Sequence, residues 1–264
     1  MKKENIINKI NKKPITYFFI LTFVISWLFW TPQIFIKKEF FILRVLGTYG
    51  PFLAAIIISQ IMGGTKQIKT LLRPLLDFKL NIVWYIFCLF STALIGFTAI
   101  GISFSLGSNQ FEFNELEKVY LVIPIFFYVL IFSVLGEETG WRGFALEHMQ
   151  KIISPLLSSI IIGLLWGVWH LPLFFIEGNF HQTLPIWLFL LQDICLSIVI
   201  TWLYNSTNKS LFSVHIFHAA SNTTLGVLPI LPIATNGDML PLYSIIILLV
   251  IFSFCIILSK RLNK

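Results

Sequence analysis

The stretch Ile82–Leu106, IVWYIFCLFSTALIGFTAIGISFSL, contains 25 residues and no charged side chain. A helix needs about 20 apolar residues to cross the hydrocarbon core of a bilayer. Water does not reach that core, so a helix that satisfies its own backbone hydrogen bonds is the structure expected there. The stretch therefore predicts a transmembrane helix.

The rest of the chain has the same character. Of its 264 residues 57% are hydrophobic and 12% are charged, whereas soluble domains carry about 25% charged residues. The mean hydropathy is +0.86. We therefore expect an all-α integral membrane protein with about eight transmembrane helices, forming one polytopic domain over residues 1–264. The eight segments are Ile15–Ile36, Phe41–Met62, Ile82–Leu106, Tyr120–Gly143, Pro155–Ile176, Leu184–Tyr204, Ser210–Ile230 and Leu240–Leu258.

The basic residues divide unevenly between the two sides of this bundle. With the N-terminus inside, fifteen Lys and Arg residues fall on the inner side and four on the outer side or adjoining helix ends, while the loop from Gly107 to Val119 is acidic. The positive-inside rule then predicts a multi-pass plasma-membrane protein with both termini in the cytoplasm. The expected partner is membrane lipid, since no basic tract with an aromatic platform indicates nucleic acid. Oligomeric state stays open, and the three cysteines have no spacing of a disulfide or metal motif.

The segment Gly136–Gly143, GEETGWRG, places three charged side chains inside the predicted fourth helix. A charge at the bilayer centre costs about 2.5–3.5 kcal/mol, so it needs a partner or a function. Glu138 and Arg142 are four residues apart and share a helix face, which predicts a supporting ion pair. Glu137 points about 100° away and is free to act as a general base. The alternative is a packing device in which both carboxylates bind Arg142.

The predicted fifth and sixth helices each carry one ionisable residue that needs an explanation. His170 ends the run WGVWH, in which Trp166 and His170 are four residues apart on one face. Asp193 lies midway along the sixth helix and is a candidate partner for a histidine. His148 and His181 lie at helix boundaries, and we assign no role to either.

The predicted seventh helix carries His215, His218 and Asn222 at offsets of three and four, which makes one stripe. A neutral imidazole accepts or donates a hydrogen bond, and an asparagine can donate to an oxyanion. His218 and Asn222 could hold a water or a carbonyl between them. For His215 a supporting role is the alternative, either orienting its neighbour or pairing with Asp193.

A free carboxylate, two histidines and an asparagine from three helices can bind and activate a water molecule. Glu137 would take its proton, and the others would position the water or stabilise a tetrahedral intermediate. Two histidines and a glutamate can also hold Zn²⁺ with one open position, and the ligands would then be Glu137, His170 and His218. The HExxH signal is absent. We favour no metal and no other cofactor, with zinc as the alternative.

These motifs resemble those of the CPBP family, the CaaX-protease and bacteriocin-processing membrane enzymes also called type II CaaX endopeptidases or the Abi family. The resemblance covers roughly Val129 to Leu228 and implies a protease-like core at about residues 120–230, with its motifs on helices 4, 5 and 7. The family's second motif usually has Phe where this chain has Trp166. The motifs read Glu137-Glu138-xxx-Arg142, Trp166-xxx-His170 and His218-xxx-Asn222.

The resemblance implies that Glu137, His170, His218 and Asn222 are catalytic. It also implies that Glu138 and Arg142 support them, and we add His215, Asp193 and Trp166 as surrounding residues. The family has been described both as metalloproteases and as metal-independent glutamate proteases, and we favour the glutamate–water mechanism.

The implied activity is an intramembrane endopeptidase that cleaves a membrane-associated or apolar peptide near the cytoplasmic half of the bilayer. Residue counting, however, puts His170 further from the inner face than Arg142. The family's eukaryotic and archaeal enzymes remove a tripeptide after a prenylated cysteine. A chain rich in Lys, Ile, Asn and Phe is typical of bacteria, so another substrate is expected. The alternatives are a non-catalytic immunity or peptide-binding protein and a small transporter.

Overall fold

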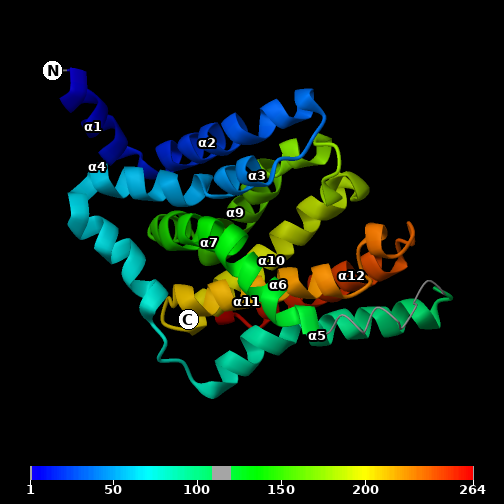
Figure 1. The fold of residues 1–264 in the computed structure, drawn as a ribbon. Helices are drawn as coiled ribbons and strands as arrows, with labels where there is room; N and C mark the ends of the chain where they lie inside the picture. Colours follow the sequence, from blue (N-terminus) through cyan, green and yellow to red (C-terminus); the bar gives the residue numbers. More distant parts are fainter. Residues whose placement is uncertain (1, 109–119, 264) are drawn as a thin grey trace.

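The computed structural model describes residues 2–108 and 120–263, and the described chain folds into a helical bundle (Figure 1). The α-helices are α1 (Lys2–Lys12), α2 (Pro14–Ile36), α3 (Phe41–Thr48), α4 (Gly50–Leu72), α5 (Ile82–Ser105), α6 (Val122–Val129), α7 (Leu135–Gly140), α8 (Glu147–Met149), α9 (Pro155–Trp169), α10 (Ile186–Ser206), α11 (Leu211–Val227) and α12 (Leu240–Leu258).

Seven helical stretches within the described residues are long and apolar enough to cross a membrane. An eighth span results if α3 and the stretch Gly50–Leu76, which are bent by 41° relative to each other, are counted together. The prediction of an all-α integral membrane protein with about eight transmembrane helices is confirmed. The seven stretches are Pro14–Ile36, Ile82–Ser105, Val122–Met149, Pro155–Phe175, Ile186–Ser206, Leu211–Ala234 and Leu240–Leu258.

Helix α4 is interrupted at Gly63 and Gly64. Gly64 has φ 61° and ψ −151°, a backbone conformation that is accessible essentially only to glycine. The chain changes direction at this point (Figure 1), and Lys66 and Lys69 follow the break. The apolar part of the second span therefore ends at Met62, as the sequence predicted.

The fourth span is a composite of α6, α7 and α8 joined by two π-helical segments, Leu130–Val134 and Trp141–Leu146. A π-helical turn contains an extra residue and rotates the side chains that follow it, and such turns are frequent at functional sites. The two segments flank α7, so they set the directions in which Glu137 and Glu138 point.

Glycines let neighbouring helices approach the site closely. A Cβ atom added to Gly140 would lie 2.5 Å from backbone atoms of Pro51, at the start of α4. A Cβ atom on Gly163 of α9 would lie 2.6 Å from the Cα atom of Ile194 on α10. These close contacts bring α4 against α7 and α9 against α10.

The bundle has two ends. At the terminal end, which contains both chain termini (Figure 1), Lys209 bonds to Glu147 at 2.9 Å and Asn205 donates to Gln150. At the far end, where α2 and α9 finish, Asn179 donates to the Glu39 carboxylate at 3.0 Å. Residues 109–119, most of the predicted acidic loop, lie outside the described part of the chain.

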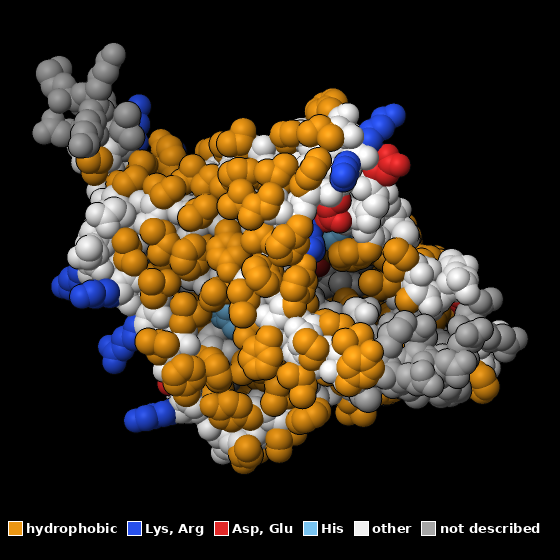
Figure 2. Space-filling view, in the orientation of Figure 1, with side chains coloured by type: hydrophobic (Ala, Val, Ile, Leu, Met, Phe, Trp, Pro, Cys, Tyr) orange, Lys and Arg blue, Asp and Glu red, His pale blue; other side chains and the backbone are white. Residues whose placement is uncertain are grey.

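The outer surface between the two ends is hydrophobic. Figure 2 shows hydrophobic side chains over most of the visible face of the bundle. Phe35 is 81% exposed and Leu94 is 70% exposed. Large apolar side chains so open to the surroundings are stable when lipid tails cover them, so this surface indicates a multi-pass membrane protein.

Candidate active site

Glu138 is the centre of a fully buried ionic network. Its Oε1 atom accepts one hydrogen bond from Arg142 Nη1 at 2.7 Å and another from His218 Nδ1 at 2.7 Å. Glu138 and Arg142 are both 0% exposed, and His218 is 2% exposed. The spacing-based prediction of a Glu138–Arg142 pair is confirmed, and the structure adds that this pair also holds a histidine of α11.

Glu137 is buried, but its hydrogen-bond partners carry no charge. Its Oε1 atom accepts from the Ser133 hydroxyl and its Oε2 atom accepts from the Trp166 indole N–H, both at 2.8 Å. Arg142 forms its salt bridge with Glu138 and none with Glu137. The packing alternative, with both carboxylates on Arg142, is therefore wrong. Glu137 also has a local partner that the motif did not predict, because Ser133 lies one turn before it.

Trp166 joins the parts of this site. Besides its bond to Glu137, its ring lies 4.6 Å from the Arg142 guanidinium carbon. Its ring centroid is 5.2 Å from that of His218 and 6.0 Å from that of His170. A phenylalanine at this position, as in the usual family motif, has no N–H to donate to Glu137. The substitution in this chain therefore adds a hydrogen bond to the candidate base.

His218 and Asn222 contact each other directly. The Nδ1–H of His218 donates to Glu138, which leaves Nε2 as the acceptor of a bond from Asn222 Nδ2 at 3.2 Å. Glu138 thereby fixes the tautomer of His218. The two side chains therefore do not hold a water between them, as the sequence suggested they could. Asn222 keeps a second N–H that can donate to a ligand.

His215 does not pair with Asp193. Its Nδ1 atom lies 2.6 Å from the Leu211 carbonyl oxygen and its Nε2 atom lies 3.4 Å from the Thr139 hydroxyl. Asp193 on α10 instead faces His170, whose Nδ1 is 3.7 Å from a carboxylate oxygen. The pairing alternative for His215 is therefore wrong, because α10 approaches α9 closely at Gly163.

His170 follows the last residue of α9, and its Nδ1–H donates to the Trp166 carbonyl at 2.9 Å. Its ring stacks on the ring of His181, with centroids 5.5 Å apart and planes at 24°. His181 is only 6% exposed. No role was expected for His181, because no local sequence pattern places this loop histidine against His170.

The residues do not converge on a metal in this arrangement. Among the described residues, no group of three or more His, Cys, Asp and Glu side chains could hold a metal ion. Both oxygens of Glu137 and both nitrogens of His218 already have hydrogen-bond partners. Binding zinc through Glu137, His170 and His218 would require breaking these bonds.

The candidate residues lie at different heights in the bundle. Helix α9 has 15 residues, so His170 is about 22 Å along the axis from Pro155 at the terminal end. His218 is seven residues from Leu211, the first residue of α11, so it is only about 10 Å from the terminal end. The expectation of a site in the cytoplasmic half of the bilayer stays a prediction.

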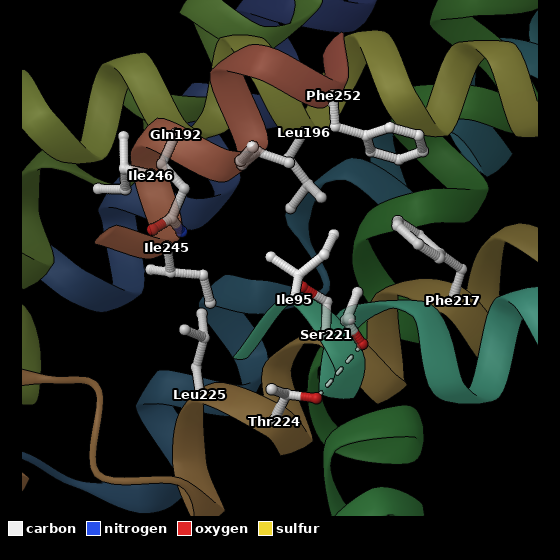
Figure 3. Close-up of a pocket in the computed structure, with 12 residues that line it drawn as sticks. Ile95, Gln192, Leu196, Phe217, Ser221, Thr224, Leu225, Ile245, Ile246 and Phe252 are labelled. Atoms are coloured by element: carbon white, nitrogen blue, oxygen red, sulfur yellow. Dashed lines mark hydrogen bonds between the residues drawn. The ribbon is translucent and has the colours of Figure 1, made fainter. Parts of the chain in front are cut away.

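A hollow lies among α5, α10, α11 and α12 (Figure 3), and the roughly 500 Å³ of space in and around it includes open solvent. None of the candidate site residues lines it. Phe217 and Ser221 point into it, and these are the neighbours of His218 and Asn222 on another face of α11. Its remaining lining is mainly apolar, with Gln192 next to Asp193 on α10.

Comparison with known proteins agrees with this geometry. A family described as type II CAAX prenyl endopeptidase Rce1-like matches residues 119–224, the region that contains all four residues predicted to be catalytic. A CAAX prenyl protease 2 of Methanococcus maripaludis is 25% identical over 229 residues, which cover 81% of this chain and 84% of that protein. The similarity supports an intramembrane endopeptidase. Both matches support the resemblance to the CPBP family of membrane proteases that the motifs on α7, α9 and α11 indicated.

Proposed function

We propose that this protein is an intramembrane endopeptidase in which Glu137 activates the attacking water. The observation that carries the proposal is the contrast between two adjacent carboxylates. Glu138 is engaged by Arg142 and His218, whereas Glu137 accepts bonds only from neutral donors. A carboxylate that is positioned but not paired with a cation keeps lone pairs available for a water proton.

The reaction would proceed in two steps. Glu137 takes one proton of the water, and the water oxygen forms a bond to the carbonyl carbon of the substrate. This addition yields a tetrahedral oxyanion. The oxyanion then collapses, the C–N bond breaks, and Glu137 returns the proton to the leaving nitrogen. The products are a carboxylic acid and an amine, so atoms and charges balance without a metal or cofactor.

The other three residues would orient the water and the oxyanion. Because the Nδ1–H of His170 is used by the Trp166 carbonyl, its Nε2 is a bare acceptor that can hold the second proton of the water. His218 accepts from Asn222 and so fixes the amide plane, which leaves the other Asn222 N–H to donate to the oxyanion.

We further propose a substrate that is membrane-associated or apolar. The hollow beside α11 is lined mainly by hydrophobic side chains and could receive an apolar portion of such a peptide. The relative named above is described as a CAAX prenyl protease. For this chain we retain the expectation of a different substrate, since its composition is typical of bacteria. We also retain one membrane domain, in the plasma membrane, with both termini in the cytoplasm.

The test compares peptides released or accumulated in cells that carry the wild-type protein or Glu137→Gln. This variant preserves an oxygen that can accept from Trp166 but removes the base, so cleavage should fall by roughly 10²–10⁴-fold. Glu147→Gln at the terminal end is the matched control and should cleave normally. A cellular phenotype that persists in folded Glu137→Gln and His218→Ala proteins would favour the non-catalytic peptide-binding alternative. Stoichiometric zinc with chelator-sensitive cleavage would overturn the metal-free step.

A further inference from the structure

A row of polar side chains connects His170 to the surface at the far end of the bundle. The Nδ1–H of His181 donates to the Asn179 side-chain oxygen at 2.7 Å, and the Asn179 amide donates to Glu39 at 3.0 Å. Glu39 lies 3.1 Å from the Arg44 guanidinium. We call His181, Asn179, Glu39 and Arg44 the far-end row.

The two inner residues of the far-end row are buried, and the two outer residues are partly exposed. His181 and Asn179 are 6% and 5% exposed, whereas the side chains of Glu39 and Arg44 are 27% and 34% exposed. Acidic and basic side chains are visible close together at the upper right of the molecule in Figure 2. The row thus runs from the surface to the edge of the candidate site, through segments that are 140 residues apart in sequence.

The inner part of the row has unused hydrogen-bonding capacity. The Nδ1 atoms of His170 and His181 donate to Trp166 and Asn179, so both Nε2 atoms are bare acceptors in the neutral rings. Neither Nε2 bonds to another described residue, and neither is among the fully buried polar atoms that lack a partner. Both Nε2 atoms can therefore accept a hydrogen bond from a water molecule.

The charge state of His181 fits an acceptor role. Burial lowers the pKa of His181 well below its ordinary value, and the nearby His170 and Arg44 lower it further. The ring of His181 is consequently neutral near pH 7, so its Nε2 atom can accept a hydrogen bond. Phe174 and Phe189 pack edge-on against the same ring, so apolar side chains border His181 on those sides.

We propose that water reaches the candidate site from the far end of the bundle, along the far-end row and past His181 to His170. With the termini in the cytoplasm, this route opens outside the cell. A hydrolase consumes one water for each bond that it cleaves, so a site enclosed by apolar helices needs such a supply. That the route supplies water for hydrolysis rests on the proposed function, but the existence of the route does not.

The route can be tested by cysteine labelling of the full chain in intact cells. In a background of Cys88→Ala, Cys195→Ala and Cys255→Ala, a small charged methanethiosulfonate reagent is applied to single variants. Asn179→Cys and His181→Cys should react from outside. Lys209→Cys, at the terminal end, should react only after permeabilisation. Ser59→Cys, fully buried on α4, should react in neither case.

Two outcomes would overturn the proposal. If Asn179→Cys reacts but His181→Cys does not, water stops at the loop and no route reaches the site. If both react only after permeabilisation, the route does not open outside the cell. Because labelling requires no cleavage, the route can fail while the Glu137→Gln result supports the protease, or the reverse.

A second measurement keeps the native residues in place and guards against misfolded variants. Diethyl pyrocarbonate modifies bare imidazole nitrogens, and mass spectrometry of the folded wild-type protein reports each histidine separately. His170 and His181 should be modified before His215, whose two nitrogens both lie within hydrogen-bond distance of partners. Equal or faster modification of His215 would contradict a water route that ends at His170.

Discussion

Replacing Arg142 by methionine would leave the Glu138 carboxylate without a cation at a position that solvent does not reach. The two side chains are bonded at 2.7 Å and both are 0% exposed. Removing one partner of such a pair typically costs about 3–5 kcal/mol, because the remaining charge stays buried and uncompensated. Methionine retains most of the aliphatic volume, so the loss would report the charge and not a cavity.

The loss should be smaller when both charges are removed. In Arg142→Met/Glu138→Gln the glutamine oxygen can still accept from His218, and neither charge of the pair remains. We expect the double variant to be more stable than Arg142→Met alone, with a coupling energy of about 0.5–3 kcal/mol. Such a cycle separates the ion pair from any general loss of packing.

The assay is thermal unfolding of the purified protein in detergent, with the same variants compared in one detergent. The matched control is Lys209→Met, which removes one of the two lysines paired with Glu147; the Lys209 side chain is 56% exposed. An exposed pair of this kind contributes at most about 1 kcal/mol. The reasoning would be refuted if Arg142→Met cost no more than Lys209→Met, or if the effects of Arg142→Met and Glu138→Gln simply added.

Three further changes test the packing and the hydrogen bonds around the site. Gly140→Ala should destabilise the fold by about 1–3 kcal/mol in the same unfolding assay, because the added Cβ would overlap the backbone of α4. The control is Gly101→Ala, whose Cβ would meet nothing within 4 Å and which should be neutral or stabilising. Trp166→Phe should cost about 1.5–3 kcal/mol by removing the indole N–H bond to Glu137, and unchanged stability would argue against that bond. Because the pKa of His181 is lowered in the folded protein and is about 6.5 when unfolded, stability should fall as the pH drops below about 6.5. His181→Phe should weaken this acid sensitivity, and an identical pH dependence of unfolding in that variant would contradict the assignment.

The local part of the site followed from the sequence because helix geometry fixes it. Residues four apart share a face, and this alone placed Arg142 next to Glu138 and sent Glu137 in another direction. The same periodicity placed Trp166 one turn before His170. Long uncharged runs defined the membrane spans, since lipid tolerates few charges and requires a helix to satisfy its own backbone.

The contacts between helices were decided only by the tertiary structure. The bond from His218 to Glu138 joins residues 80 apart, and that from Trp166 to Glu137 joins residues 29 apart. Asp193 faces His170 and not His215 because α10 packs closely on α9.

Side-chain spacing fixes neighbours within one helix but not which helices pack together or how they are rotated. In this fold glycine contacts bring the helices together, and two π-helical segments set the direction of the fourth span. For the same reason the role of His181 could not be predicted. The sequence by itself determined the membrane class and the motifs, while packing determined which residues those motifs contact.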